Sequence, residues 1–146
     1  MIDFGFMLPI DDELWTLLQG IARAFATGRR EDRIAAVKEW AWITDDPAHA
    51  EHLRLFVEYT EWAWRSCYWE GPFDFGDEAD FRRGIELFTE LVLRRYSPGR
   101  SCTGVLIRQD FGLRSLLYRL KACVDVRAIT EDELKATGWD RSSWHA

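Results

Sequence analysis

The residues of this sequence whose types and spacing could do chemistry are the aspartates of three Asp-Phe-Gly tripeptides, at 3–5, 74–76 and 110–112. In phosphoryl-transfer sites such an aspartate ends a short strand and holds a Mg²⁺ ion that bridges the phosphates of ATP. Residues 74–76 follow a Gly-Pro pair and are typical of a turn, whereas residues 110–112 fall inside a helical pattern. Only Asp3 has an apolar lead-in and then a polar turn into a helix. Asp3 is therefore the first candidate site residue.

Two weaker constellations accompany the aspartates. His49 and His52 lie at i, i+3 near a helix start, a spacing that could place two imidazoles on one metal ion. No further ligand follows at helical spacing, which favours an ordinary exposed pair. Cys67 and Cys123 have no nearby histidine in the sequence to serve as a base, so a cysteine nucleophile is not expected.

Composition limits the classes of function. The chain has 146 residues, a net charge of −6 and 47% hydrophobic residues, which is a globular composition without general affinity for nucleic acid. Its 3 cysteines are widely spaced with no Cys-x-x-Cys, as in reduced cytosolic proteins. No signal peptide and no apolar run of about 18 residues is found. We therefore expect a cytoplasmic protein, at most peripheral to a membrane.

The charge is distributed unevenly along the chain. Basic residues outnumber acidic ones between Arg82 and Arg127, while residues 1–76 are strongly acidic. A solvated basic face is the ordinary interpretation of such a pattern. A surface for an anionic lipid headgroup or an acidic partner is the alternative.

The elements that must position these residues are helices. Apolar residues recur at helical spacing in six segments, and no segment after residue 10 alternates with period two. The fold class predicted is all-α, a bundle of five to six helices in a single helical domain over 1–146. Residues 1–10 would form a strand and turn, 11–138 the helices and 139–146 a tail. The expected helices run from Asp11 or Asp12 to Gly28, then over 31–43, 47–68, 77–96, 104–122 and 130–138.

Several features of packing follow from the same patterns. The helix over 47–68 is apolar on two sides and is expected to be central. In the helix over 104–122, Gly112 is expected at a close contact, and a capping box over Thr130–Glu133 should open the last helix. The residues predicted to face inward from the helix over 104–122 are Leu106, Leu113, Leu116, Leu117 and Leu120.

Taken in order, these segments resemble the C-terminal part of the AarF/UbiB atypical kinase-like family, the homologues of a ubiquinone-biosynthesis kinase. The resemblance covers nearly the whole chain. Two departures are Ile107, where the family has His, and additional tryptophans in the middle of the chain. The segments that carry the resemblance are Ile2-Asp3-Phe4-Gly5, Gly28-Arg29-Arg30-Glu31-Asp32, Gly71-Pro72-Phe73-Asp74-Phe75-Gly76, Leu93-Arg94-Arg95, Leu106-Ile107-Arg108-Gln109 with Gly112, Leu120-Lys121-Ala122 and Arg127-Ala128-Ile129.

The resemblance implies a lobe like the C-terminal lobe of a protein kinase, with ATP and Mg²⁺ as cofactors and Asp3 as the metal- and cofactor-binding residue. It also implies a role in ubiquinone or isoprenoid-lipid metabolism. The remaining machinery is missing: the sequence has no glycine-rich nucleotide loop, no His-x-Asp catalytic loop and no asparagine for a second metal ligand. The lysines, Lys38, Lys121 and Lys135, lie in or near predicted helices rather than on a strand. No catalytic residue is assigned, and the chain alone is not expected to transfer phosphate.

Two hypotheses remain open from sequence. In the first, the chain is a fragment or split partner that needs a missing N-terminal kinase-like lobe. In the second, it is a stand-alone helical module that binds a protein or a lipid surface through exposed tryptophans and the basic stretch.

Overall fold

The computed structural model describes residues 11–27, 29–96, 99–100 and 102–136. The strand and turn predicted at 1–10, the cap predicted at Gly28 and the tail predicted at 139–146 lie outside these ranges. The described elements are helices α1 (Asp12–Thr27), α2 (Arg30–Ala41), α3 (Ala50–Tyr68), α4 (Glu78–Leu93), α5 (Thr103–Arg119) and α6 (Val126–Ala136), the 3-10 turn η1 (Pro47–His49), and strands β1 (Phe73–Asp74) and β2 (Cys123–Val124). The prediction of an all-α fold is confirmed.

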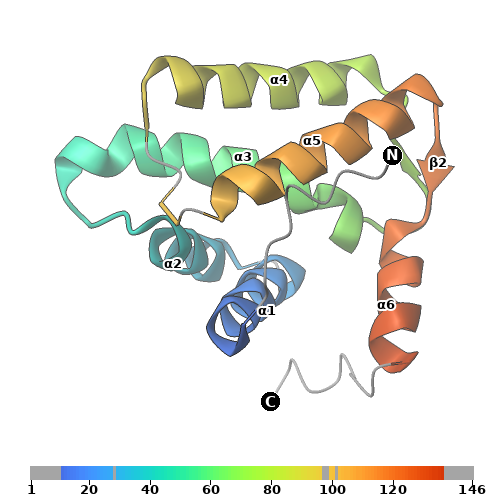
Figure 1. Ribbon diagram of the computed structural model, residues 1–146, viewed down its shortest axis with the longest axis horizontal. Helices are drawn as coiled ribbons and strands as arrows, with labels where there is room; N and C mark the ends of the chain where they lie inside the picture. Colours follow the sequence, from blue (N-terminus) through green and yellow to red (C-terminus); the bar gives the residue numbers. More distant parts are fainter. Residues whose placement is uncertain (1–10, 28, 97–98, 101, 137–146) are drawn as a thin grey trace, which may run out of the picture.

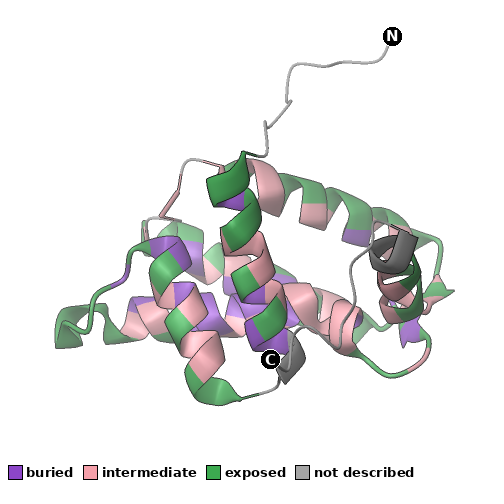
Figure 2. Cartoon of the chain, turned by 90° about the horizontal axis from the view of Figure 1, so that it is seen from below, coloured by how far each residue is buried: buried purple, intermediate pink, exposed green. Residues whose placement is uncertain are grey.

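The longest helix, α3, is the centre of the arrangement, as its two apolar sides predicted. It packs against α1, α2, α4 and α6 (Figure 1). Leu55 and Trp62, on α3, are among the most deeply buried side chains. Figure 2 shows the buried residues gathered on the sides of the helices that face one another.

Aspartates fix where several of the helices begin. The Asp11 carboxylate accepts a hydrogen bond from the Leu14 amide at 2.8 Å. The Asp46 carboxylate accepts one from the Ala48 amide, at the start of the 3-10 turn that begins with Pro47. Asp77 does the same for the first turn of α4. Each carboxylate satisfies an amide that the helix itself leaves open.

The last helix begins earlier than the capping box predicted. Asp125 is the residue that accepts from the first turn, through the Ala128 amide at 2.8 Å, so α6 starts at Val126. Thr130 lies one turn inside the helix, where its hydroxyl donates to the Val126 carbonyl. The expectation that Thr130 caps this helix was wrong because Asp125, five residues upstream, is the stronger cap.

A short antiparallel pairing, not predicted from sequence, joins β1 to β2. Phe73 pairs with Val124 and Asp74 with Cys123. The Phe75 amide donates to the Ala122 carbonyl at 2.9 Å, and the Lys121 ammonium donates to the Gly76 carbonyl. Two residues per strand are too few for an alternating pattern to show, which is why the periodicity missed them.

The predicted inward face of α5 is right at Leu106, which packs against the core, but wrong further along the helix. Leu113, Leu116 and Leu120 are exposed, by 59%, 54% and 66%, and its buried residues are Thr103 and Arg114. The leucine-rich face was expected to point inward on hydrophobicity alone. An arginine that reaches buried acceptors takes that place instead, as described below.

A glycine at a close contact does exist, but on α4 rather than α5. A Cβ at Gly84 would lie 2.1 Å from the Trp62 ring, whereas a Cβ at Gly112 would meet nothing within 4 Å. The prediction that packing requires Gly112 was therefore wrong. The indole of Trp62 takes the space beside Gly84 and donates from Nε1 to the Asp80 carbonyl at 2.9 Å.

These two glycines give a matched test of the packing. Gly84→Ala should lower the free energy of unfolding by about 1–3 kcal/mol, because the methyl group forces Trp62 away from α4. Gly112→Ala should instead raise it by up to about 1 kcal/mol through helix propensity. Urea denaturation of both variants measures the difference, and equal effects at the two positions would contradict the assigned packing.

Candidate functional site

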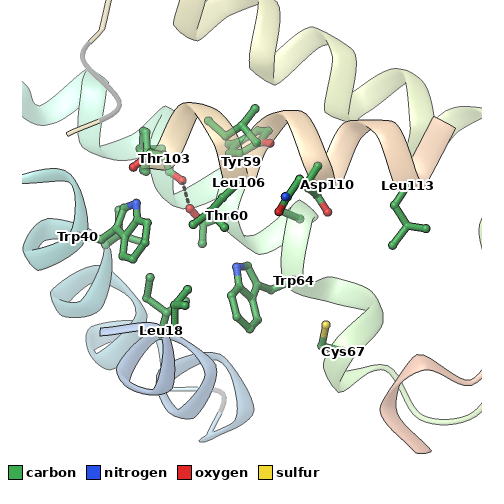
Figure 3. Close-up of a pocket in the computed structure, with 16 residues that line it drawn as sticks. Leu18, Trp40, Tyr59, Thr60, Trp64, Cys67, Thr103, Leu106, Asp110 and Leu113 are labelled. Carbon is green, nitrogen blue, oxygen red and sulfur yellow. Dashed lines mark hydrogen bonds between the residues drawn. The ribbon is translucent and has the colours of Figure 1, made fainter. Parts of the chain in front are cut away.

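A cavity of about 350 Å³ between α1, α2, α3 and α5 is the candidate functional site (Figure 3). Its walls are mainly aliphatic and aromatic. The backbone of α5 makes few close approaches to α3, so side chains cover the space between them without filling it. The lining residues are Leu18, Ile21, Val37, Trp40, Phe56, Tyr59, Thr60, Ala63, Trp64, Cys67, Thr103, Leu106, Ile107, Gln109, Asp110 and Leu113.

The cavity is partly open to solvent along α5. Gln109 and Leu113 are the lining residues with exposed side chains, so they mark the mouth. The opposite wall is formed by Ile21, Val37 and Trp40, which are all buried. A small molecule could therefore enter beside α5 and reach the core without unfolding a helix.

Three buried polar atoms in this lining have no hydrogen-bond partner: the Tyr59 hydroxyl, the Thr103 hydroxyl and Oδ2 of Asp110. Leaving such a group unpaired costs about 1–3 kcal/mol each, which is why they are few in folded proteins. The hydroxyl of Thr60, by contrast, is satisfied by the Phe56 carbonyl at 2.7 Å. The unpaired atoms are the positions at which a ligand could be recognised.

The unpaired atoms divide between the two ends of the cavity. Tyr59 lies near Asp110, because its ring stacks on Phe111, the next residue of α5, with ring centroids 6.1 Å apart. Burial raises the pKa of the Tyr59 phenol, and the Asp110 charge adds to that effect. Thr103 lies seven residues before Asp110, about 10 Å along the helix axis, and Figure 3 shows it toward the other end. The cavity thus has one polar pair and one separate hydroxyl.

The Asp110 carboxyl is the group whose titration is most relevant to the site. Burial raises its pKa to about 6, against the opposing effect of the Arg114 guanidinium 3.6 Å from Oδ1. Burial likewise raises the pKa of the Cys67 thiol. The thiol is therefore held in its neutral form, which does not favour a nucleophilic role.

Arg114 holds this wall in place. Its guanidinium is buried and donates to the carbonyls of Trp62 at 2.8 Å and Ala63 at 2.9 Å, with the Asp80 carboxylate at 3.5 Å. It also lies 4.2 Å from the centroid of the Trp62 ring. Arg65 completes the group through an ion pair of 2.7 Å with Asp80.

Sequence reasoning missed this site for identifiable reasons. Arg114 was counted with the basic stretch, and Asp110 only as part of an Asp-Phe-Gly tripeptide. A signal did exist in the sequence. Asp110 follows Thr103 by seven residues and precedes Arg114 by four, which places three polar residues on one face of a helix otherwise rich in leucine.

The other predicted site residues lie elsewhere. Asp3, the predicted ligand of Mg²⁺ and ATP, is outside the described residues, so its role stays a prediction. Asp74 is used locally, since its carboxylate accepts from the Gly76 amide at 2.8 Å in the turn that was predicted. Asp110 lies inside a helix, as predicted.

The predicted histidine pair is not a pair in the structure. The exposed His49 ring lies 2.9 Å from the Thr44 hydroxyl. His52 is buried, contrary to the expectation of an exposed pair, and stacks on Tyr96 with ring centroids 4.5 Å apart. Within the described ranges, no three His, Cys, Asp or Glu side chains gather closely enough to hold a metal ion. Cys67, Cys102 and Cys123 are free thiols.

Much of the basic stretch is engaged in ion pairs. Arg83 reaches Glu58 on α3 at 2.6 Å, and Arg94 pairs with Glu90 and Glu51. Arg127 pairs with Glu131 at 3.0 Å. The anionic-lipid interpretation of this stretch stays a prediction.

Comparison with protein-family models, with curated proteins and with solved structures finds no match to the chain. The resemblance to the AarF/UbiB family therefore rests on the sequence segments alone. None of the helices in the described ranges combines the length and the apolar character that crossing a bilayer requires.

The raised pKa of Asp110 predicts how stability depends on pH. Because the folded protein holds this proton more tightly than the unfolded chain, the group's contribution to stability is present below about pH 4 and is lost as pH rises to about 6. Asp110→Asn should therefore stabilise the protein by roughly 1–2 kcal/mol at pH 7.5, with allowance for partial exposure, and by little at pH 4.

Thermal melts of the variant and the parent protein at both pH values measure this effect. The parent protein is the control at each pH, so that the titration of all other groups cancels. A gain of the same size at pH 4 and pH 7.5 would contradict the assignment.

Proposed function

We propose that this chain is a helical binding module that holds a small, mainly apolar molecule in the cavity between α1, α2, α3 and α5. The observation that carries the proposal is the combination of an apolar wall with unpaired polar atoms. Sites for small molecules are typically of this kind, with a few placed polar groups in a hydrophobic pocket of about 300–1,000 Å³.

The volume limits the size of the ligand. A dry engineered cavity of about 150 Å³ holds benzene, so about 350 Å³ corresponds to roughly fourteen non-hydrogen atoms. This suits a bicyclic ring system or a medium alkyl chain. Long lipids would have to extend through the mouth beside Leu113.

The first test uses naphthalene as the probe and the indole N–H signals of a ¹⁵N-labelled protein as the readout. Trp40 and Trp64 line the cavity, so their signals should shift in a saturable way. Trp15 and Trp42 are exposed and outside the lining, so their signals should not move. Uniform shifts of all indoles, or none, would refute binding in this cavity.

A blocking variant sharpens the test. Ala63→Phe places a ring in the cavity from α3 and should abolish the naphthalene-induced shifts of Trp40 and Trp64. The same substitution at Ala50 on the same helix, which is exposed and outside the lining, is the control and should leave them unchanged. Thermal melts of both variants confirm that each is folded.

A second candidate function is the lobe of a kinase-like protein of the AarF/UbiB type, which would bind Mg²⁺ and ATP through Asp3 together with an N-terminal lobe. What supports it is that two of the resembling segments are hydrogen-bonded together. Residues 71–76 meet residues 120–122 through the Phe75 amide and the Lys121 ammonium. This candidate does not exclude a small-molecule cavity in the same lobe.

A thermal melt with and without millimolar Mg·ATP tests the second candidate. A nucleotide at about 100 times its dissociation constant should stabilise by about 2.7 kcal/mol, a rise in melting temperature of several degrees. The rise should be absent in Asp3→Ala. A cooperative melt without any shift would mean that this chain alone has no nucleotide site.

A further inference from the structure

The unpaired atoms at one end of the cavity also limit the chemistry of the ligand, an inference that rests on the proposed function. Tyr59 is 4% exposed and its hydroxyl has no partner, although it can both donate and accept. Asp110 contributes Oδ2, which as a carboxylate oxygen only accepts. The Tyr59 ring stacks on Phe111, the residue next to Asp110, with ring centroids 6.1 Å apart, and the Tyr59 and Asp110 side chains line the same cavity.

The charges around this pair are already balanced. Asp110 faces Arg114 at 3.6 Å, Arg114 faces Asp80 at 3.5 Å, and Asp80 faces Arg65 at 2.7 Å. Two carboxylates and two guanidinium groups therefore cancel. An ammonium or carboxylate on the ligand would add a buried charge without a partner of its own, which is unfavourable.

We infer that the ligand is an uncharged alcohol or phenol with an apolar body, whose hydroxyl lies between Tyr59 and Asp110. Its O–H donates to Oδ2 of Asp110, and its oxygen accepts from the Tyr59 phenol. One small group thus satisfies both orphaned atoms. A water molecule would serve the polar atoms but would leave the apolar remainder of the cavity unfilled.

Four compounds with one common ring system test the inference at pH 7.5: naphthalene, 2-naphthalenemethanol, 2-naphthylmethylamine and 2-naphthoic acid. Dissociation constants come from the shifts of the Trp40 and Trp64 indole signals. The alcohol should bind about tenfold more tightly than naphthalene, as expected for one to two added hydrogen bonds. The amine and the acid should bind at least tenfold more weakly than the alcohol.

Variants locate the hydroxyl. Tyr59→Phe removes one hydrogen-bond partner of the ligand hydroxyl. It should weaken binding of the alcohol about three- to tenfold and leave the affinity for naphthalene unchanged. Asp110→Asn keeps the shape of the side chain but removes its negative charge. The variant should therefore bind 2-naphthoic acid more tightly than the parent protein does. Thr103→Val removes the unpaired hydroxyl at the other end of the cavity and is the matched control. It should leave the preference for the alcohol intact.

The outcomes separate this inference from the proposed function. If no compound binds, the proposed function fails and the inference fails with it. If naphthalene binds as tightly as the alcohol, the cavity is a binding site but the inference is wrong. If the amine binds most tightly, the inference of an uncharged ligand is wrong and the ligand is a cation. If Thr103→Val loses the preference for the alcohol over naphthalene, the ligand hydroxyl lies at Thr103 and not between Tyr59 and Asp110, which also contradicts the inference.

Discussion

The buried guanidinium of Arg114 is the interaction on which the described structure depends. It joins the end of α3, the start of α4 and the middle of α5 through two carbonyls and two carboxylates. Removing this guanidinium would leave two carbonyls and the Asp80 and Asp110 carboxylates without their buried donor, which is strongly destabilising. The orientation of α5 follows, because Arg114 must face inward and the leucines at 113, 116 and 120 then face solvent.

The cavity is a consequence of the same arrangement. Arg114 donates to the carbonyl of Ala63, whose side chain lines the cavity, so α5 is fixed to α3 beside the empty space. Tyr59, Trp62, Phe88 and Phe111 pack in tilted and stacked pairs, and among these four rings it is Tyr59 that lines the cavity. The polar atoms left unpaired beside it are unfavourable for the empty protein, and that cost is offset when a ligand occupies them.

Sequence patterns predicted the helices well and the site poorly, for physical reasons. Aspartate caps and apolar spacing are local, so the segments and the central place of α3 could be read from the chain. The inward face of α5 was missed although Thr103, Asp110 and Arg114 share one side of the helix, because the acceptors that bury Arg114 come from α3 and α4, far along the chain. The same holds for Gly84, whose role depends on the position of Trp62, and for His52, which Tyr96 covers.

The pairing of β1 with β2 has a consequence for the order of folding. It joins Phe73 to Val124, and all of α4 and α5 lies in the loop that it closes. Closing a loop of about fifty residues through a few backbone hydrogen bonds is entropically unfavourable until the helices within the loop have docked. We therefore expect the strand pair to form after α4 and α5 have docked on α3. Opening the strand pair alone would leave Gly84 packed on Trp62 and Arg114 bound to its α3 carbonyls.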